Sequence, residues 1–496
     1  MNSQRHVDVL IVGAGVSGVG AACHLTRELP GRSYAILERR RRIGGTWDLF
    51  RYPGVRSDSD MYTFGFNFRP WLDTKVLADG PSIRSYVNAT AAEYGVTEHI
   101  TFGRRMTAAA WSSADGHWTV TAVDEQTGTP ETWTCDFLVV CTGYYDYDKG
   151  YRPELPGEAD FGGTLVHPQH WPDDLDYRGK RVVVIGSGAT AITLVPAMAR
   201  DAAHVTMLQR SPSYIVSLPA VDKISLAMRK VLPAGFVYRL ARGRNILLQR
   251  GMYAFARWRP NAMRKLVLAG ARKHLGPDAD VSHFKPKYDP WDQRLCVVPD
   301  GDLFSALRNG SADIVTDTID TFTSDGIRLA SGKELPADIV VVATGLQVQL
   351  LGGADLSVDG ESVAVSRRVT YKGVLLEGVP NAAIVFGYTN ASWTLKADLA
   401  AEYVTRLLRH MTASGYTQVV ARADESERGP GSVMGTLKSG YVQRADGELP
   451  RQGLHAPWRV LNDYLRDAPM MRRGRIDDGI LKFSRTPARA SEQVDA

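Results

Sequence analysis

The chain of 496 residues is longer than a single hydrophobic core usually supports, so two or three domains are expected. Its hydrophobic content of 44% and charged content of 23% are ordinary for a globular protein. Neither an apolar run of about eighteen residues nor a signal-peptide pattern occurs. The four cysteines lie far apart, which disfavours a disulfide framework, a redox-active dithiol and a metal site. These features predict a reduced, cytoplasmic setting.

Positive charge is concentrated in one part of the chain. The formal net charge is only +5, yet the stretch from Asp222 to Lys273 holds thirteen Lys or Arg residues against one acid. Two interpretations stay open: a solvated helical face, or a peripheral contact with the anionic inner face of a membrane. No nucleic-acid partner is expected.

The N-terminal region carries a dinucleotide-binding pattern. Residues 7–13 form an apolar, β-branched run typical of a strand buried in a parallel sheet, and a helix is expected to about Glu28. Between them, Gly13, Gly15 and Gly18 allow a tight turn and close approach of a pyrophosphate to the helix N-terminus. Glu38 ends the next predicted strand, where a carboxylate can accept hydrogen bonds from ribose hydroxyls.

A second unit repeats this layout. A strand is expected over residues 180–186 and another over 204–210, with a helix between them that ends near Arg200. The second strand ends in Gln209 and Arg210, so the ribose-binding acid is absent and a guanidinium stands in its place. An Arg here suits a 2′-phosphate and favours NADPH over NADH. The glycine-rich turn of this unit comprises Gly186, Ser187, Gly188, Ala189, Thr190 and Ala191.

The duplication predicts an α/β fold with two Rossmann-like dinucleotide-binding domains and a helical insertion in the second. Residues 135–143, CDFLVVCTG, mirror residues 337–345, ADIVVVATG, and each would be a later strand of its own sheet. The first domain is therefore expected to be interrupted by the second. The predicted boundaries are 1–146 and 346–485 for the first domain, 147–211 and 291–345 for the second, 212–290 for the helical insertion and 486–496 for a disordered tail.

Two longer motifs are more specific than the glycine fingerprints. Residues 161–172 fit F-x-G-x-x-x-H-x-x-x-W-P at every fixed position, and residues 44–58 fit [AG]-G-x-W-x-x-x-x-[FY]-P-[GM]-x-x-x-D. Both motifs resemble those of type I Baeyer-Villiger monooxygenases. The phrases TWDLFRYPG, HPQHWP, DPWDQRL and GYTNASWTLKADL are most similar to the ethionamide-activating members, and the resemblance extends over nearly the whole chain.

The resemblance implies permanently bound FAD, NADPH as electron donor, and hydrophobic ketones or thioether and thiocarbonyl compounds as substrates of an O2-dependent enzyme. The reaction would proceed through a flavin C4a-peroxide. Implied FAD contacts are Ser17, Glu38, Gly45, Thr46, Trp47, Asp58 and the backbone of Met106. Implied nicotinamide-cofactor contacts are Arg56, Ser57, Gly186 to Ala191, Gln209 and Arg210.

Arg294 is the best candidate for the chemical step, together with Asp58. It follows the helical insertion at the place where the family carries its active-site Arg, although many members have Lys-Arg and this chain has Gln293-Arg294. A fixed guanidinium remains charged when desolvated, so it can stabilise anions that form above a flavin. Asp58 is implied to reach the region between the flavin and the nicotinamide.

Other functions place different demands on the sequence. A disulfide reductase would need a Cys pair near the first unit, and none occurs. An N- or S-hydroxylating flavin monooxygenase is the nearest alternative, and it usually ends the linker motif in Phe or Tyr where this chain has Trp171-Pro172. A membrane-docked dehydrogenase that reduces quinone could use the basic segment. A non-catalytic flavin-binding module would need neither Arg294 nor an NADPH site.

Overall fold

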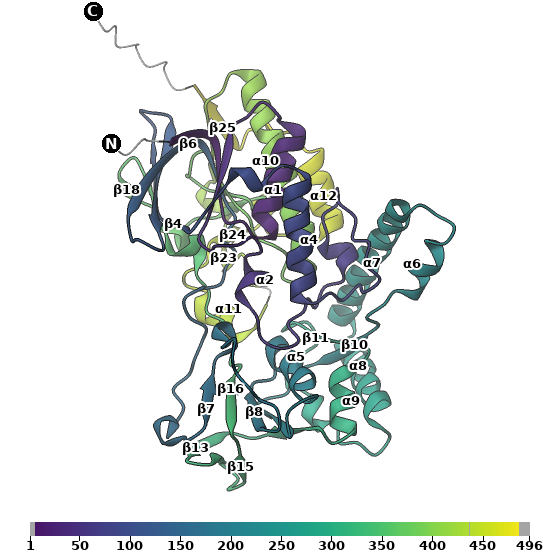
Figure 1. Cartoon of the computed structure of the whole chain (residues 1–496). Helices are drawn as coiled ribbons and strands as arrows, with labels where there is room; N and C mark the ends of the chain where they lie inside the picture. Colours follow the sequence, from purple (N-terminus) through teal and green to yellow (C-terminus); the bar gives the residue numbers. More distant parts are fainter. Residues whose placement is uncertain (1–4, 436, 486–496) are drawn as a thin grey trace, which may run out of the picture.

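The computed structural model describes residues 5–435 and 437–485, which form two α/β bodies stacked along the long axis of the molecule (Figure 1). The upper body in this view holds an eleven-stranded sheet, and the lower body holds a five-stranded sheet. The predicted tail, 486–496, lies outside the described residues. The expected α/β class with two nucleotide-binding units is confirmed.

The first sheet is built around a buried parallel core. Strand β1 lies between β6 and β2, and β3 follows β2. Every side chain from Val9 to Val12 is buried, which explains the uninterrupted apolar run of this strand. The bounds of these strands are β1 (Arg5–Val12), β2 (Tyr34–Glu38), β3 (Ile100–Phe102) and β6 (Pro130–Val140).

Other strands of this sheet show that the chain leaves the first domain and returns to it. Strand β21 pairs in parallel with β6, although the whole second domain lies between them in sequence. Strands β4 and β5 are antiparallel neighbours of β6, and β17 and β18 extend the sheet beyond β4. The bounds are β4 (Arg104–Ser112), β5 (His117–Asp124), β17 (Asp355–Val358), β18 (Glu361–Ser362), β19 (Thr370–Tyr371), β20 (Leu375–Leu376) and β21 (Ala382–Ile384).

Helices cover one side of the first sheet, with α1 packed against α10 (Figure 1). Helix α10 begins at Trp393, whose side chain lines the cavity described below. The helices are α1 (Val16–Glu28), α2 (Thr46–Leu49), α3 (Met61–Phe64), α4 (Gly80–Glu93), α10 (Trp393–Ser414), α11 (Gly440–Ala445) and α12 (Tyr464–Arg472). Two small strand pairs are β22 (Gln418–Ala421) with β25 (Leu481–Ser484), and β23 (Arg428–Ser432) with β24 (Arg451–Gly453).

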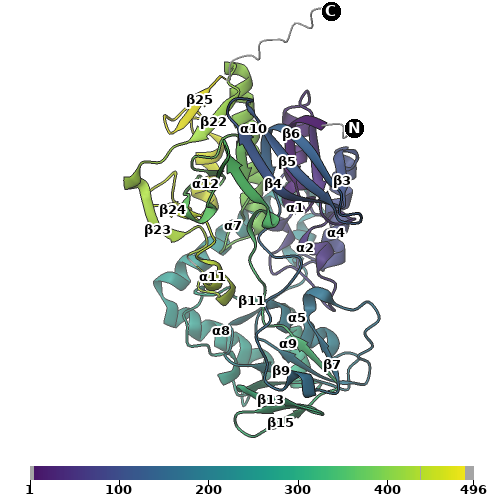
Figure 2. The ribbon, with the colours of Figure 1, turned by 90° about the vertical axis from the view of Figure 1, so that its left-hand side faces the viewer.

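The second domain repeats the parallel plan in the order β12, β9, β8, β16, β7. Strand β16 lies beside β8 as β6 lies beside β1, so the two sequence segments that mirror each other occupy equivalent places. Its elements are β7 (Thr164–Val166), β8 (Arg181–Ile185), α5 (Ala189–Met198), β9 (His204–Gln209), α9 (Asp302–Arg308), β12 (Ala312–Thr316) and β16 (Ile339–Val342). A three-stranded sheet of β13 (Ile319–Thr323), β14 (Gly326–Leu329) and β15 (Glu334–Pro336) lies at the lower end (Figure 2).

The stretch expected to be helical contains three α-helices, one short strand and a 3-10 helix at Ser282–Phe284. Strand β10 (Ile215–Leu218) pairs in parallel with β11 (Cys296–Pro299), so the pair closes the base of the insertion. Between these strands the chain forms α6 (Lys223–Met228), α7 (Ala234–Trp258) and α8 (Pro260–Leu275). Within the described residues, no helix has both the length and the apolar character needed to cross a bilayer.

Helix α7 is anchored on the first domain by buried polar groups. Arg242 is only 4% exposed, and its guanidinium donates to the carbonyl oxygens of Tyr62 and Gly65 at 2.7 Å. The same group lies 3.6 Å from the Asp398 carboxylate, which also faces His24 of α1 at 3.6 Å. A buried charge is tolerated only when it is paired and hydrogen-bonded, so this network fixes how the insertion sits on the first domain.

Candidate active site

The turn after β1 has the geometry that the first glycine fingerprint predicts. Gly13 has φ +104°, and a Cβ atom there would lie 2.6 Å from the Cys141 carbonyl oxygen. A Cβ on Gly18 would lie 1.8 Å from the Gly13 carbonyl oxygen. Helix α1 begins after Gly15 and has no acidic residue in its first turn. Its free N–H groups and helix dipole therefore favour an anionic group at this end.

Glu38 lies at the carboxyl end of β2, on the wall of the same cavity. Its side chain is 3% exposed and accepts hydrogen bonds from the backbone N–H of Ala14 at 2.6 Å and of Arg40 at 2.7 Å. Burial raises the pKa of Glu38, and the N–H groups of Arg40 and Ala14 partly offset that effect. These contacts fix the direction of the carboxylate beside the glycine turn.

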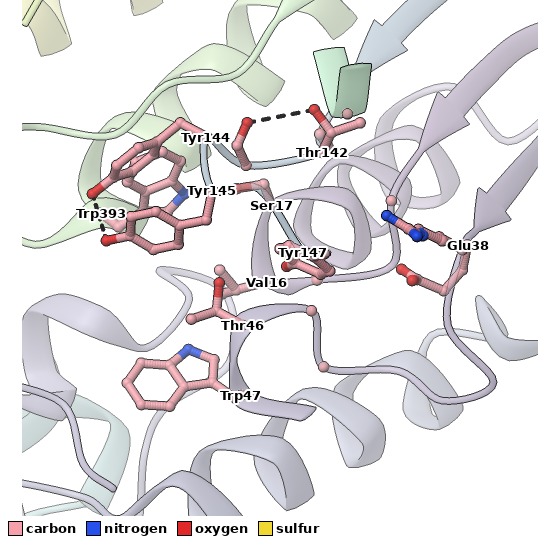
Figure 3. A pocket seen from close by; sticks show the side chains of 18 of the residues that line it. Val16, Ser17, Glu38, Thr46, Trp47, Thr142, Tyr144, Tyr145, Tyr147 and Trp393 are labelled. Atoms are coloured by element: carbon pink, nitrogen blue, oxygen red, sulfur yellow. Dashed lines mark hydrogen bonds between the residues drawn. The ribbon is translucent and has the colours of Figure 1, made fainter. Parts of the chain in front are cut away.

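One cavity of about 300 Å³ brings most of the predicted site residues together (Figure 3). It extends from Glu38 past the glycine turn to a cluster of aromatic side chains. The predicted residues that line it are Gly13, Gly15, Ser17, Glu38, Gly45, Thr46, Trp47, Arg56, Ser57, Asp58, Met106, Ala189 and Arg294. Since Ala189 begins α5, the second nucleotide-binding unit also reaches this cavity.

Sequence reasoning missed the aromatic part of the wall. Tyr144 stacks on Trp393 with ring centroids 5.3 Å apart, and its hydroxyl lies 2.8 Å from that of Tyr145 (Figure 3). The indole N–H of Trp393 donates to the Ser17 hydroxyl at 2.8 Å. Tyr147 also lines the cavity. The sequence does contain a signal for these tyrosines, because all three follow the Thr-Gly turn after β6. That turn lies at the carboxyl end of the strand beside β1, where ligands of open α/β sheets bind.

Asp58 lines the cavity and is half-buried there. Burial raises the pKa of its carboxyl group to about 6, although the guanidinium groups of Arg56 and Arg294 act in the opposite direction. The carboxylate therefore stands near two cations from different domains of the chain. A small change in its surroundings decides whether it is charged near neutral pH.

Arg294 is open to the cavity and also lines a second, smaller cavity of about 20 Å³. Its Nη2 donates to the Tyr388 carbonyl oxygen at 3.3 Å, and among residues 5–435 and 437–485 its other N–H donors have no hydrogen-bond partner, so they can meet other groups. Around the smaller cavity, Phe386, Val433 and Val460 provide apolar walls. A cation next to apolar walls can stabilise a developing negative charge more strongly than it could in water.

The loop that carries Arg294 is fixed by ion pairs on both sides. Asp292 pairs with Arg257 of α7 at 2.9 Å and with Lys438 at 3.1 Å. Asp289 pairs with Arg264 of α8 at 2.8 Å. The helical insertion and the returning first domain thus hold the loop from opposite directions, and the guanidinium is positioned by both.

The second glycine turn repeats the first. Gly186 has φ +139°, and a Cβ there would lie 2.3 Å from the Ala343 carbonyl oxygen, as Gly13 faces Cys141. Gly188 and Ala189 are exposed at the start of α5, and the Ser187 hydroxyl donates to the Ser211 carbonyl at 2.9 Å. The open N-terminus of α5 can accept a second pyrophosphate.

The other residues expected to contact NADPH differ in how far their side chains are exposed. Arg210 is exposed, as a phosphate ligand must be, and Thr190 is half-buried. Gln209 is 1% exposed, and its amide donates to the His283 carbonyl and the Thr316 hydroxyl, both at 2.9 Å. Ala191 is fully buried on the inner face of α5. Since these two side chains point into the core, only backbone atoms of Gln209 and Ala191 could meet a cofactor.

The residues present fit the two predicted cofactors. From Glu38 onward, the larger cavity offers a fixed carboxylate for ribose, then an anion-binding helix end, then a planar aromatic cluster, which is the order in which FAD carries ribose, pyrophosphate and the flavin ring. Gly186 and its neighbours offer the second helix end.

Comparisons with known proteins agree with this geometry. The family model of flavin-binding monooxygenase-like proteins matches residues 67–240, and that of NAD(P)-binding Rossmann-like domains matches residues 11–74. MymA of Mycobacterium tuberculosis (strain ATCC 25618 / H37Rv), named as an FAD-containing monooxygenase, is 57% identical over 97% of this chain and 98% of its own length. The FAD-containing monooxygenase EthA of the same strain is 53% identical over 98% of this chain and 99% of its own length.

The chain belongs to the family of FAD-containing monooxygenases. The predicted family resemblance, the enzyme class of an NADPH-dependent flavin monooxygenase and the cofactors FAD and NADPH are thereby confirmed. Among solved structures, a steroid monooxygenase bound to NADP has a TM-score of 0.75 at 21% identity, covering 97% of this chain and 100% of that one. A cyclohexanone monooxygenase has the same TM-score and coverage at 20% identity. At these identities the two structures establish the shared fold of this flavin monooxygenase.

Proposed function

We propose that this flavin monooxygenase uses NADPH and O2 to convert hydrophobic ketones to esters, and that it also oxidises the sulfur of thioether and thiocarbonyl compounds. Bound FAD would supply the O2 chemistry with two electrons from NADPH, so that one oxygen atom enters the bond beside the carbonyl and the other leaves as water. The observation that carries the proposal is the position of Arg294, which lines the main cavity near Asp58 and borders the smaller apolar cavity.

In this proposal the chain's own residues bind and orient the reactants. The α1 end and Glu38 hold FAD, while Trp47, Tyr144 and Tyr145 contact its ring system. The α5 end, Arg56, Ser57 and Arg210 hold NADPH. The lining of the cavity and the exposure of the second glycine turn support these assignments.

Arg294 would stabilise negative charge that develops on the substrate carbonyl oxygen. Its free N–H donors and its fixed loop support this role, since a donor that is already positioned costs no reorganisation during the reaction. Asp58 would keep that guanidinium oriented while it is ionised.

The alternative is an enzyme that only hydroxylates nitrogen or sulfur, for which no carbonyl adduct forms. A panel of alkyl ketones and thioethers in aerobic NADPH turnover, with products identified by mass spectrometry, separates the two. Ester formation supports the proposal. Oxidation of thioethers or amines without any ester from the ketones contradicts it.

Substitution of Arg294 tests the site itself. Arg294→Ala should still consume NADPH and O2 but release hydrogen peroxide, with ester formation about 100- to 1000-fold slower, because one fixed electrostatic partner is lost. Arg178→Ala, at a side chain that is 77% exposed, is the matched control and should behave as the wild type. Ester formation by Arg294→Ala at near wild-type rate would mean that Arg294 only supports the structure.

A further inference from the structure

Exposed apolar side chains gather on the helical insertion. Of the fifteen large hydrophobic side chains that are exposed in the described part of the chain, twelve lie between residues 218 and 266. Single exposed hydrophobics are normal, but a concentration of them on one segment marks an interaction surface. The twelve are Leu218, Ile224, Val231, Leu232, Phe236, Leu240, Leu247, Leu248, Met252, Phe255, Trp258 and Leu266.

Helix α7 arranges these side chains in a row. Phe236, Leu240, Leu247 and Trp258 recur at spacings that place them within about 40° of one another around the helix. A row of arginines, residues 239, 250 and 257, runs along one edge of that face. An apolar face with a basic edge is the pattern of a helix that lies in the interface of a membrane.

Much of the positive charge on this surface is not neutralised within the protein. Among residues 5–435 and 437–485, no acidic partner forms an ion pair with Lys223, Lys230, Arg239, Lys265 or Lys273. Arg244, Arg250, Arg257 and Arg264 do pair with carboxylates. The unpaired cations lie on all three helices of the insertion, so they can meet an extended anionic surface.

We propose that α6, α7 and α8 form a docking surface for a lipid bilayer that contains anionic lipids. The apolar row of α7, together with Ile224 and Val231, would enter the boundary between headgroups and acyl chains, and the unpaired cations would meet the headgroups. Figure 1 shows α6 and the start of α7 projecting together at one edge of the molecule. A second copy of the chain fits this surface less well, because two such faces would bring like charges together and lysine is depleted at protein interfaces.

The buried side of α7 contacts a residue that borders the candidate active site. Ile246 packs against Tyr388, which lines the smaller cavity and accepts the hydrogen bond from Arg294. Ile246 and Tyr388 therefore connect the helix that carries the proposed lipid contact with the wall of the smaller cavity. Delivery of hydrophobic substrates from the bilayer to that pocket rests on the proposed function, whereas docking itself does not.

Vesicle sedimentation of the FAD-loaded protein tests the proposal without any turnover. The protein should sediment with vesicles of phosphatidylcholine and phosphatidylglycerol and remain in solution with phosphatidylcholine alone, and high salt should release it. The double variant Leu240→Ser, Leu247→Ser should bind anionic vesicles at least tenfold more weakly, since two exposed apolar side chains are removed. Replacing Lys223, Lys230 and Arg239 by Gln should weaken binding about fivefold per charge.

Leu72→Ser is the matched control, because Leu72 is 58% exposed but lies outside the insertion. This variant should bind anionic vesicles as the wild type does. FAD content and turnover of a water-soluble ketone verify that each variant is folded. Absence of wild-type sedimentation with anionic vesicles overturns the proposal. A second result also overturns the proposal: the wild type self-associates, and the Leu240→Ser, Leu247→Ser variant is a monomer that binds vesicles as the wild type does. In that case the surface is assigned to contact with a second copy.

Discussion

Arg56 and Asp302 form an ion pair across the two nucleotide-binding domains, with Nη1 donating to Oδ2 at 2.6 Å. Arg56 follows the first glycine unit in the chain, and Asp302 begins α9 of the second domain. Their side chains are 10% and 22% exposed, so the pair is partly shielded from solvent. Because Arg56 is also proposed to contact NADPH, the pair and the cofactor compete for one guanidinium.

Release of Arg56 should therefore tighten NADPH binding. In Asp302→Asn the neutral amide holds the guanidinium less strongly, and the Michaelis constant for NADPH should fall about fivefold, as expected when an opposing ion pair of ~1 kcal/mol is removed. Asp320→Asn, which breaks an exposed pair with Arg328 in the same domain, is the control and should leave the constant unchanged. Steady-state kinetics measure both. A rise in the constant for Asp302→Asn would mean that the pair builds the NADPH site instead of opposing it.

Arg210 should decide the choice between NADPH and NADH. Its exposed guanidinium lies at the end of β9, close in sequence to the strand end where a dinucleotide's ribose is expected. Loss of a charge-assisted phosphate contact, about 1.5 to 3 kcal/mol, predicts that Arg210→Ala raises the Michaelis constant for NADPH at least tenfold and spares that for NADH. The exposed Arg200 of the same domain offers a control, as Arg200→Ala should change neither constant. Equal effects of Arg210→Ala on both cofactors would exclude the assignment.

The ionisation of Asp58 should appear in the pH profile. Burial raises the pKa of this carboxyl to about 6, so it is protonated below pH 6 and charged above it. If the charged form orients Arg294, then kcat/KM for the ketone should increase with pH through about 6 in the wild type. In Asp58→Asn this increase should be absent, and kcat/KM should be low at every pH. The same increase of kcat/KM with pH in the variant would assign the titration to another group.

Protonation of His24 should contribute to stability. Burial disfavours the charged ring, but the carboxylates of Asp398 and Glu28 raise the pKa of His24 to about 9 from an ordinary 6.5. Because the folded protein holds this proton more tightly than the unfolded chain, the contribution is complete below pH 6.5 and is lost as pH rises through 9. The shift corresponds to ~3 kcal/mol at most.

Apparent melting temperatures between pH 6 and pH 9.5 measure this contribution. The melting temperature of the wild type should fall steadily across that range. His24→Gln should melt at a lower temperature at pH 6, and its melting temperature should change less with pH. His455→Gln, at an exposed histidine, should follow the wild-type slope. The same slope in His24→Gln as in the wild type would show that other groups control stability there.

The sequence by itself determined the parts of the site that depend on local geometry. The turns at Gly13 and Gly186 have positive φ and leave no room for a Cβ, so the glycine spacing alone predicts them. The place of Glu38 is also predictable from the sequence, because the expected second strand ends at this residue, as β2 does in the structure. The long linker and flavin motifs further indicated the family, which the relatives confirm.

The tertiary structure decided everything that depends on contacts between distant segments. Tyr144 meets Trp393, and Arg56 meets Asp302, only because the chain leaves the first sheet after β6 and returns to it at β21. No local pattern encodes such pairs. Gln209 has a sequence position that suits a cofactor contact, yet the alternation of side chains along β9 turns its amide into the core. Likewise, the composition of the insertion showed its charge, but only packing against the first domain determined which face of α7 stays exposed.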